Sequence, residues 1–590
     1  MPRHGVLAAT SEEKPMSKIE PSVEEHFVSL AMSLPYLFGA AALLNTALAH
    51  PSTSKHDSHP ARLLSSRDVC SGNTASTRSE WCDYSIDTDY STVVPDTGVT
   101  REYWLTLDDV TIAPDGVSRS AMAVNGSIPG PTLFADWGDT VTVHVTNNLV
   151  DSKNGTSIHW HGIRQNYTND QDGVVSITQC PTAPEDTYGS TWYHSHFALQ
   201  AWQGIFGGLI INGPATADYD EDLGMLFLND WDHQTVDELY IAAQSSGPPT
   251  LDNGLINGTN TYDDGGYRYN TSFTSGMSYR IRLVNAAVDT HFKFMVDNHT
   301  MQVIASDLVP ITPYETTVLD IGMGQRYDVI ITADQADVAD NFWLRAIPQS
   351  ACSENDNSDD IRGIIYYGDS PSTPSTSAYS YEDSCDDETD NLVPYISKTV
   401  ESESSINIEA ASVGFNSDRH FRWYLNSTTM VVAWENPTLE QILAGNSTYE
   451  TSNAVLELPD ANVWTYLVIE TTLAVPHPIH LHGHDFAVLA QGSGTYSSSV
   501  SLNLSNPPRR DTAMLPASGY LVLAFETDNP GAWLMHCHIG WHTSEGFALQ
   551  FIERYDEIAA LTNETRLADG CDRWTSFTEE ASVEQDDSGV

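Results

Sequence analysis

A pair of strand-like segments occurs three times along the chain, and this repeat constrains the fold more than any other feature. The first segment lies at residues 138–147, 276–285 and 461–470. The second segment follows at residues 192–196, 343–347 and 533–538. Each copy of the second segment begins with Trp. Short alternating runs between clusters of Gly, Pro, Asn and Asp are typical of β-sandwiches, and three copies of one such unit account for the length of 590 residues.

The repeat predicts an all-β chain with three consecutive β-sandwich domains. We place the domains at residues 98–215, 216–385 and 394–568, followed by a C-terminal tail at residues 569–590. The acidic, Ser- and Pro-rich stretch 367–390 is typical of a linker between the second and third domains. No long stretch repeats apolar residues at helical spacing, so we expect no long helix.

The N-terminal region is typical of a targeting segment. Residues 27–49 form an uncharged, mostly apolar run that ends in Ala47-Leu48-Ala49, a pattern that signal peptidase cleaves. We interpret residues 1–49 as a signal peptide, with a true start codon inside this stretch as an option, and residues 50–67 as a pro-segment. The run is also long enough to span a bilayer, so a membrane anchor is the alternative.

The charge of the chain limits its partners. Lys and Arg number 26 against 80 Asp and Glu, which gives a formal net charge of −54. Such a charge repels phosphate backbones and anionic lipid, so we expect neither nucleic-acid binding nor association with a membrane.

Cysteines and glycosylation sequons also indicate secretion. Of the seven cysteines six can pair, and Cys537, which lies between two histidines, is the candidate for the unpaired thiol. We expect a secreted, extracellular monomer that is N-glycosylated at some of ten Asn-x-Ser/Thr sites, namely Asn125, Asn154, Asn166, Asn257, Asn270, Asn298, Asn426, Asn446, Asn503 and Asn563.

Ten of the 21 histidines fall in four short clusters, all in the first and third domains. The clusters are His159-x-His161, His194-x-His196, His477-x-x-His480-x-His482 and His536-Cys537-His538-x-x-x-His542. Side chains alternate between the two faces of a strand, so both imidazoles of an extended His-x-His point the same way. Cys537 then points away from His536 and His538, and adjacent residues can bind two different metal centres.

The types of ligand select the metal. One Cys with two His, here Cys537 with His477 and His542, is suited to a blue-copper electron-transfer site. The eight further imidazoles could hold three more copper ions. Structural zinc is the competing interpretation, but it favours Cys₄ or Cys₂His₂ sets at C-x₂₋₄-C spacing, which the sequence does not contain.

The four clusters resemble the copper motifs of the multicopper oxidases, and within that family those of ascomycete laccases, over residues 101 to 551. The resemblance implies three cupredoxin-like domains with a Greek-key β-sandwich fold and four copper ions. It assigns the type 1 ion to His477, Cys537 and His542, with Phe547 and Ile539 at non-coordinating axial positions. It assigns the type 2 ion to His159 and His480. The type 3 pair is assigned to His161, His194 and His538 on one ion and to His196, His482 and His536 on the other.

The activity implied by the resemblance is that of a laccase, a benzenediol:oxygen oxidoreductase. Such an enzyme takes single electrons from phenols or aromatic amines and reduces O₂ to two waters. We expect electrons to enter through an exposed edge of His477 and to cross from Cys537 to His536 and His538. Lignin fragments, pigment precursors and plant phenols remain alternative reductants.

Two acidic residues resemble functional residues of the family. Asp172 is similar to the acid that lies near the trinuclear cluster, where protons must arrive. Asp252, which precedes residues 255–258, is similar to the acid that takes the phenolic proton. A plain turn is the alternative interpretation for each of them, since each lies beside Gly or Asn.

The C-terminal residues Asp587-Ser-Gly-Val590 are similar to the end that plugs the channel to the cluster in ascomycete laccases. A frayed acidic tail is the alternative. The same resemblance implies disulfides between Cys70 and Cys82, Cys180 and Cys571, and Cys352 and Cys385.

Other functions of the same fold remain alternatives. A ferroxidase would oxidise Fe²⁺ with acidic residues near His477 and usually carries a C-terminal membrane helix. A pigment-pathway phenol oxidase would differ in substrate alone, and an ascorbate oxidase would normally have Met at position 547. A copper store would not need ten histidine ligands in this order.

Overall fold

The computed structural model describes residues 71–149, 155–180, 189–402, 407–417, 419–581, 585 and 587–590. These residues belong to one compact unit, Ala61–Val590. The predicted signal peptide, the pro-segment and Cys70 lie outside the described residues, so the Cys70–Cys82 disulfide stays a prediction. Every helix within the described ranges is too short or too polar to cross a bilayer.

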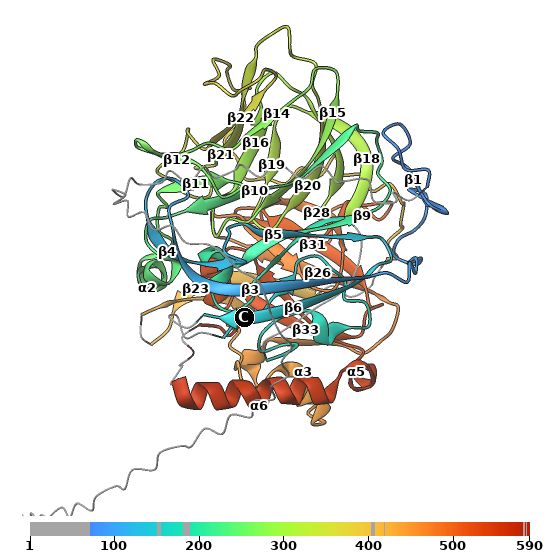
Figure 1. Cartoon of the computed structure of the whole chain (residues 1–590). Helices are drawn as coiled ribbons and strands as arrows, with labels where there is room; N and C mark the ends of the chain where they lie inside the picture. The colour runs from blue at the N-terminus through green and yellow to red at the C-terminus, as the bar shows by residue number, and fades with distance from the viewer. Residues whose placement is uncertain are drawn as a thin grey trace, which may run out of the picture. The chain divides into compact units, whose positions relative to one another are not determined.

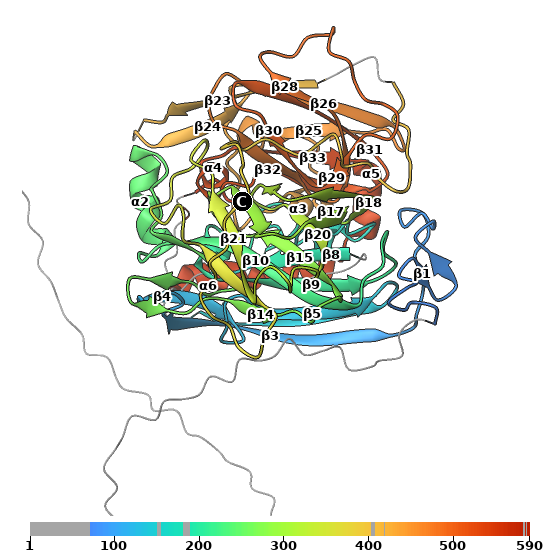
Figure 2. The same cartoon turned by 90° about the horizontal axis from the view of Figure 1, so that it is seen from above.

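The chain forms three consecutive β-sandwiches, as the repeat predicts (Figures 1 and 2). The first sandwich, blue to cyan in Figure 1, pairs a three-stranded with a four-stranded sheet. The order across the three-stranded sheet is β4 (Arg119–Val124), β3 (Thr100–Ile112) and β6 (Thr140–Asn148). The order across the four-stranded sheet is β5 (Gly130–Asp136), β9 (Phe206–Asn212), β8 (Gly189–His194) and β7 (His159–Trp160).

The second sandwich, in green and yellow, consists of a six-stranded and a five-stranded sheet. The six strands are β11 (Asn253–Ile256), β10 (Glu221–Trp231), β15 (Ser278–Asn285), β20 (Arg326–Thr332), β17 (Met301–Ser306) and β18 (Val309–Thr316). The five strands are β14 (Asn270–Ser272), β22 (Arg362–Tyr366), β21 (Asn341–Pro348), β16 (Phe292–Val296) and β19 (Leu319–Ile321).

The third sandwich, in orange and red, repeats the arrangement of six and five strands. Its larger sheet contains β24 (Phe421–Leu425), β23 (Asn407–Phe415), β26 (Trp464–Thr471), β31 (Gly519–Glu526), β28 (Phe486–Ser493) and β29 (Arg509–Arg510). Its smaller sheet contains β25 (Val455–Leu458), β33 (Ala548–Glu553), β32 (Gly531–Cys537), β27 (His477–Leu481) and β30 (Thr512–Leu515).

Short elements complete the fold. Two hairpins pair β1 (Glu80–Trp81) with β2 (Tyr84–Ser85), and β12 (Thr261–Tyr262) with β13 (Gly265–Gly266). The helices are α1 (Gln200–Gln203), α2 (Val236–Ser246), α3 (Thr438–Leu443), α4 (Gly540–Ser544), α5 (Tyr555–Leu561) and α6 (Glu564–Ala581), with 3₁₀ turns η1 (Asn169–Gln171) and η2 (Thr451–Asn453).

The repeated segments are equivalent strands of the three sandwiches. The first segment forms β6, β15 and β26, and the second forms β8, β21 and β32. In each sandwich the first of these strands pairs in parallel with an earlier strand, β3, β10 or β23. The repeat in the sequence is therefore a repeat of topology.

An asparagine at a tight turn recurs in the same place in each sandwich. Asn125, Asn257 and Asn426 adopt the left-handed backbone conformation, with φ of 52°, 47° and 44°. The side-chain oxygen of each accepts a hydrogen bond from the N–H of Thr106, Phe227 or Ala410 at 2.6, 2.8 and 3.0 Å. The amide nitrogen donates to the main-chain oxygen of Trp104, Met225 or Ile408. Each turn is thereby fixed to a neighbouring strand, since Asn tolerates this conformation and its amide both donates and accepts.

The expectation of no long helix is wrong for the C-terminal region. Helix α6 has 18 residues, and it begins at Glu564, inside the stretch that we assigned to the third domain. Its buried residues Leu567, Cys571 and Trp574 lie four and three residues apart, and so share one face. They pack in a hydrophobic cluster with Phe197 of the first domain and Trp434 of the third. The apparent tail is thus an amphipathic helix between these two domains.

Candidate metal centres and substrate pocket

The four histidine clusters converge where the first and third domains meet. His159 on β7 lies opposite His194 on β8, and His480 on β27 lies opposite His536 on β32. The remaining imidazoles lie on these strands or just beyond their ends, except that of His542, which lies on α4. The alternation of side chains along short strands therefore directs the His-x-His pairs to one side, and all ten histidines are buried.

The thiol of Cys537 faces a separate group of two imidazoles. Cys537 Sγ lies 3.9 Å from His477 Nδ1 and 3.6 Å from His542 Nδ1, and the two nitrogens are 3.3 Å apart. With metal–ligand bonds of about 2.0–2.3 Å, a trigonal site would separate its ligand atoms by about 3.5–3.8 Å. The three atoms therefore fit one ion.

The other eight imidazoles form a second centre. Two triads have ligand atoms that lie within 4.8 Å of one another, His161 with His194 and His538, and His196 with His482 and His536. His159 and His480 lie beside them, with ring centroids 5.8 Å apart. The two triads contain the same residues as the two predicted type 3 sets.

Several buried ring nitrogens at this centre are orphaned, that is, without a hydrogen-bond partner, and this indicates whether the centre fits a metal. His159 Nδ1 and His480 Nδ1 each lie 2.8 Å from a main-chain oxygen, of Asp172 and of Asp511. Their Nε2 atoms are buried without a hydrogen-bond partner among the described residues, as are Nε2 of His482 and both ring nitrogens of His538. Metal-binding histidines typically direct one ring nitrogen at such an outer partner and the other at the ion. The residues present thus fit metal ions bound by imidazole.

Burial also sets the protonation of these groups. It lowers the pKa of His477 to about 3, and lowers the pKa of His161, His194, His196, His482, His536, His538 and His542 well below the usual value. Neutral imidazoles are the form that binds a metal. Burial raises the pKa of the Cys537 thiol, so a bound cation is needed to stabilise its thiolate.

Asp172 lies at the eight-imidazole centre, where it contacts one histidine of the third domain and one of the first. Its Oδ2 is 2.9 Å from His482 Nδ1, and its Oδ1 is 3.3 Å from His159 Nδ1. The carboxylate is fully buried.

A second acid at this centre was missed by the sequence analysis. Asp511 Oδ1 lies 3.2 Å from His161 Nε2, and the carboxylate forms a two-point ion pair with Arg326 of the second domain at 2.6 and 2.5 Å. The guanidinium holds the pKa of Asp511 well below its usual range despite burial. No sequence signal marks it, because Arg509-Arg510-Asp511 looks like a solvated charge run.

Aromatic rings enclose the thiol centre. Phe547 is buried with its ring centroid 5.1 Å from that of His477, and Ile539 is also buried. Trp423 stacks on Phe547 at 4.9 Å and contacts His542 at 4.2 Å between centroids. Neither Phe nor Ile has a side-chain atom that can coordinate a metal, so a three-coordinate ion at this centre stays a prediction.

A pocket of about 420 Å³ opens beside His542. Its walls come from α2, from residues 247–250 and 352–354, from β24 and from α4, and they include Trp423, Trp541, Asp289 and Glu545. The expected exposed edge of His477 is wrong, because its side chain is fully buried while His542 lines the pocket. Trp423 and Phe547 pack against the His477 ring.

The acidic residues of the pocket differ from the one that the sequence indicated. Asp252 does not line the pocket, and its Oδ2 lies 2.8 Å from His233 Nδ1. Glu545 is paired with Arg422 and accepts a hydrogen bond from Tyr240 at 2.9 Å. Asp289 does line the pocket, and burial, reinforced by Asp230, raises its pKa to about 8. It was missed because nothing in the sequence near it marks a site.

The last residues of the chain are buried against α4, which carries His542. Ser588 Oγ donates to the main-chain oxygen of Thr543 at 2.8 Å, and Ser176 Oγ donates to that of Gly589 at 2.7 Å. Val590 is buried in the hydrophobic cluster that contains Trp434. Residues 587–590 are therefore docked rather than frayed.

Two predicted disulfides are present in the structure. Cys180 is bonded to Cys571 on α6, and Cys352 is bonded to Cys385. Cys537 is the free cysteine of the described residues, and it is buried.

Three stretches of the chain match family models described as multicopper oxidase, at residues 106–216, 222–370 and 420–557. Laccase-2 of Botryotinia fuckeliana is 48% identical over 549 residues, which cover 88% of this chain and 93% of that protein. A laccase of Neurospora crassa is 39% identical and covers 88% of this chain and 89% of its own length.

Solved structures show the same similarity. The crystal structure of a laccase from Botrytis aclada matches with a TM-score of 0.84 at 46% identity, covering 88% of this chain and 99% of that one. Fet3p, described as a multicopper oxidase that functions in iron import, matches with a TM-score of 0.72 at 26% identity. The match covers 83% of this chain and 97% of that one.

Proposed function

The chain belongs to the multicopper oxidases, in which it functions as a laccase, and on this premise we propose that its two histidine-rich centres hold four copper ions. His477, Cys537 and His542 would bind the type 1 ion, and His159 and His480 the type 2 ion. The type 3 pair would be bound by the two triads, His161, His194 and His538, and His196, His482 and His536.

One observation carries this assignment. Buried imidazoles with orphaned nitrogens surround one centre, while a buried thiol and two imidazoles within 3.9 Å form the other. A thiol with two imidazoles favours copper over hard cations, and neutral imidazoles without carboxylate ligands do the same.

Bound copper would supply the redox chemistry, accepting single electrons from an organic reductant and reducing O₂ to water. The chain contributes the positions of the ligands. Cys537 is covalently joined to His536 and His538, so one strand would connect the two centres. His542 would present its ring to a reductant in the pocket.

The proposed reductants are phenols and aromatic amines. The pocket beside His542 is lined by Trp423, Trp541 and other apolar side chains, which suit a flat aromatic molecule. We place the proton acceptor at Asp289 rather than Asp252, because Asp289 lines this pocket and Asp252 is paired with His233. A carboxylate there could take the phenolic proton as the electron leaves.

Asp172 is the proposed proton donor at the other centre. It contacts His482 and His159, whose free nitrogens point at the centre. An acid at this position could deliver protons to reduced oxygen and also orient both imidazoles.

Secretion, N-glycosylation and a monomeric state are further proposals. The two disulfides favour an oxidising compartment. Nine of the ten sequon asparagines lie among the described residues, and all nine are exposed or half-buried. Mass spectrometry of the secreted protein before and after deglycosylation, together with light scattering, would test all three.

The proposed function is tested by metal analysis and oxygen uptake on the purified protein. We expect four copper ions per chain, and one O₂ consumed for every four molecules of a one-electron phenolic donor. Fewer than four copper ions in fully loaded protein would contradict the assignment of ligands. Oxidation of Fe²⁺ without oxidation of phenols would instead favour a ferroxidase.

A further inference from the structure

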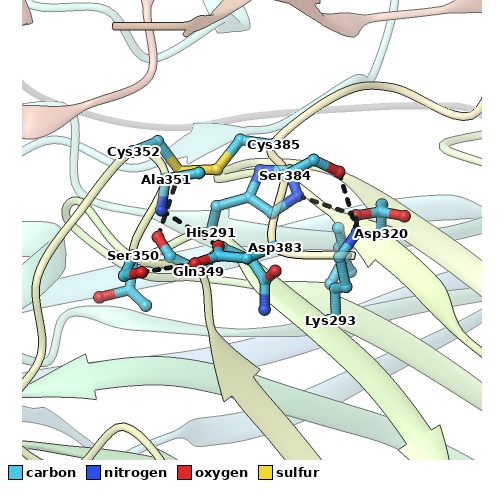
Figure 3. Close-up of a disulfide and its surroundings, with 12 residues drawn as sticks. His291, Lys293, Asp320, Gln349, Ser350, Ala351, Cys352, Asp383, Ser384 and Cys385 are labelled. Atoms are coloured by element: carbon cyan, nitrogen blue, oxygen red, sulfur yellow. Dashed lines mark hydrogen bonds and ion pairs between the residues drawn. A yellow bond between two sulfur atoms is a disulfide. The ribbon is translucent and has the colours of Figure 1, made fainter. Parts of the chain in front are cut away.

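A buried imidazole without a hydrogen-bond partner lies beside the Cys352–Cys385 disulfide (Figure 3). His291 is fully buried, and neither of its ring nitrogens has a hydrogen-bond partner among the described residues. A ring nitrogen of His291 and the two sulfur atoms lie within 4.8 Å of one another. Buried polar groups are nearly always paired in native proteins, so this imidazole requires an explanation.

His291 has an ion-pair contact with Asp320 but no hydrogen bond among the described residues. The Asp320 carboxylate lies 3.7 Å from Nε2, beyond hydrogen-bond length, and it is held in an ion pair by Lys293. Lys293 also donates to Ser384 Oγ at 3.3 Å, which anchors it beside the second cysteine. Figure 3 shows the imidazole between the disulfide and this ion pair.

The disulfide can be reached from the pocket next to His542. Cys352 is half-buried and lines that cavity, whereas Cys385 is buried. Cys352 lies in the loop between β21 and β22, and Cys385 lies in the irregular segment after β22. Neither cysteine lies in a strand, and the hydrogen bond from the Ala351 N–H to Asp383 Oδ1 at 3.1 Å joins their two segments independently of the disulfide.

We propose that reduction of this disulfide creates a binding site for a thiophilic d¹⁰ cation, Cu⁺ or Zn²⁺, formed by Cys352, Cys385 and His291. A thiol reductant supplies two electrons and two protons to the two sulfurs and becomes its own disulfide. A phosphine supplies two electrons and becomes its oxide, and a water molecule supplies both the oxygen atom of that oxide and the two protons that complete the thiols. Binding of the cation then displaces both thiol protons. Two thiolates with one imidazole are the soft ligand set that such ions prefer.

The Cys180–Cys571 bridge provides an internal comparison. Cys180 and Cys571 are both buried in the hydrophobic cluster that contains Phe197, Trp434 and Trp574. Reduction there should produce two thiols without an imidazole to complete a site. The position of His291, rather than the presence of a disulfide, therefore determines where the cation binds.

The test uses the four-copper holoenzyme without oxygen. The protein is reduced with tris(2-carboxyethyl)phosphine, freed of reductant and titrated with Cd²⁺, whose thiolate complexes absorb in the ultraviolet. We expect one tightly bound Cd²⁺ per chain, by elemental analysis and by absorbance, that unreduced protein does not bind. Parallel titrations with Zn²⁺ and Cu⁺ would identify the preferred ion by its lower Kd.

Three variants assign the site. C352S/C385S should lose the tight Cd²⁺, and C180S/C571S should retain it. H291F keeps both thiols and should weaken Cd²⁺ binding at least tenfold, while H299F, at a buried histidine whose two nitrogens are both hydrogen-bonded, should not. Retention of full affinity by H291F, or absence of the extra Cd²⁺ in reduced wild type with both thiols titratable, would overturn the proposal.

Discussion

Asp172 Oδ2 lies 2.9 Å from His482 Nδ1, and this contact joins the first domain to the third at the eight-imidazole centre. The main-chain oxygen of the same residue lies 2.8 Å from Nδ1 of His159. One residue thus orients imidazoles from both domains and leaves the Nε2 atoms of both for a metal. The contact explains why a turn residue in the first domain matters for ligands in the third.

Replacing Asp172 with Asn should therefore slow the reduction of O₂ and leave the rate of substrate oxidation unchanged. The amide cannot deliver a proton, and its contact with His482 is weaker, so we expect O₂ reduction to slow by about 10–100-fold. Stopped-flow measurement of the reaction of reduced enzyme with O₂ would show the loss. Anaerobic reduction of the enzyme by a phenol should remain unchanged.

The control for this variant is Asp170→Asn, which changes a buried acid in the same turn that pairs with Arg566. It should leave both half-reactions intact. Equal slowing of both half-reactions in Asp172→Asn would indicate general damage to the centre and contradict the proton role.

Replacing Asp289 with Asn should slow phenols much more than a reductant without a transferable proton, such as ferrocyanide. A carboxylate must be ionised to accept a proton, and burial raises the pKa of Asp289 to about 8. Below that pH the carboxyl is mostly protonated, so the Asp289-dependent part of kcat/KM for phenols should rise with pH up to about this value. The variant should not show this rise with pH, and its kcat/KM for phenols should be lower by about 10²-fold.

Asp252→Asn is the matched comparison, because its carboxylate pairs with His233 outside the pocket. It should leave the pH profile for phenols intact. If Asp252→Asn abolished the rise with pH and Asp289→Asn did not, the original interpretation of the sequence would be restored.

The separation of Cys537 from its two histidine neighbours could be predicted because it depends on local geometry. Alternation along β27 and β32 separates Cys537 from His536 and His538 whatever the rest of the fold does. The three-domain architecture could also be predicted from the sequence, because the same pair of strand segments occurs three times in the same order. Helix α6 could also have been found from the spacing of Leu567, Cys571 and Trp574.

The pocket could not be predicted, because segments far apart in the sequence build it. Asp289 becomes significant only when α2, the loop after β21 and α4 meet around it. The sequence offered Asp252, in Asp252-Asn-Gly, either as the acceptor of the phenolic proton or as part of a plain turn. In the structure its carboxylate is paired with His233. The burial of His477 likewise depends on Trp423, whose strand begins more than fifty residues earlier.

Replacing Phe547 with Met should lower the reduction potential of a type 1 copper bound by His477, Cys537 and His542. The buried Phe547 ring lies against His477 and offers no ligand atom, whereas a thioether there could coordinate and favour the oxidised ion. We expect a decrease of about 60 mV or more, which is a tenfold change in a one-electron equilibrium. Phe547→Leu, which also lacks a ligand atom, is the control. A redox titration with equal potentials for Met and Leu would contradict the axial role.

Deleting residues 587–590 should weaken α4 and with it the position of His542. The deletion removes the hydrogen bond from Ser588 to the main-chain oxygen of Thr543 and exposes the apolar surface that Val590 covers. The loss of buried Val alone corresponds to about 2 kcal/mol, to which the hydrogen bonds add about 1 kcal/mol each. We expect a lower Tm by calorimetry and a weaker blue absorption per copper, because His542 is less well held. Val590→Leu, which keeps an apolar side chain at the buried end, should preserve both properties. An unchanged Tm in the deletion would mean that these residues rest on the surface of α4 without stabilising it.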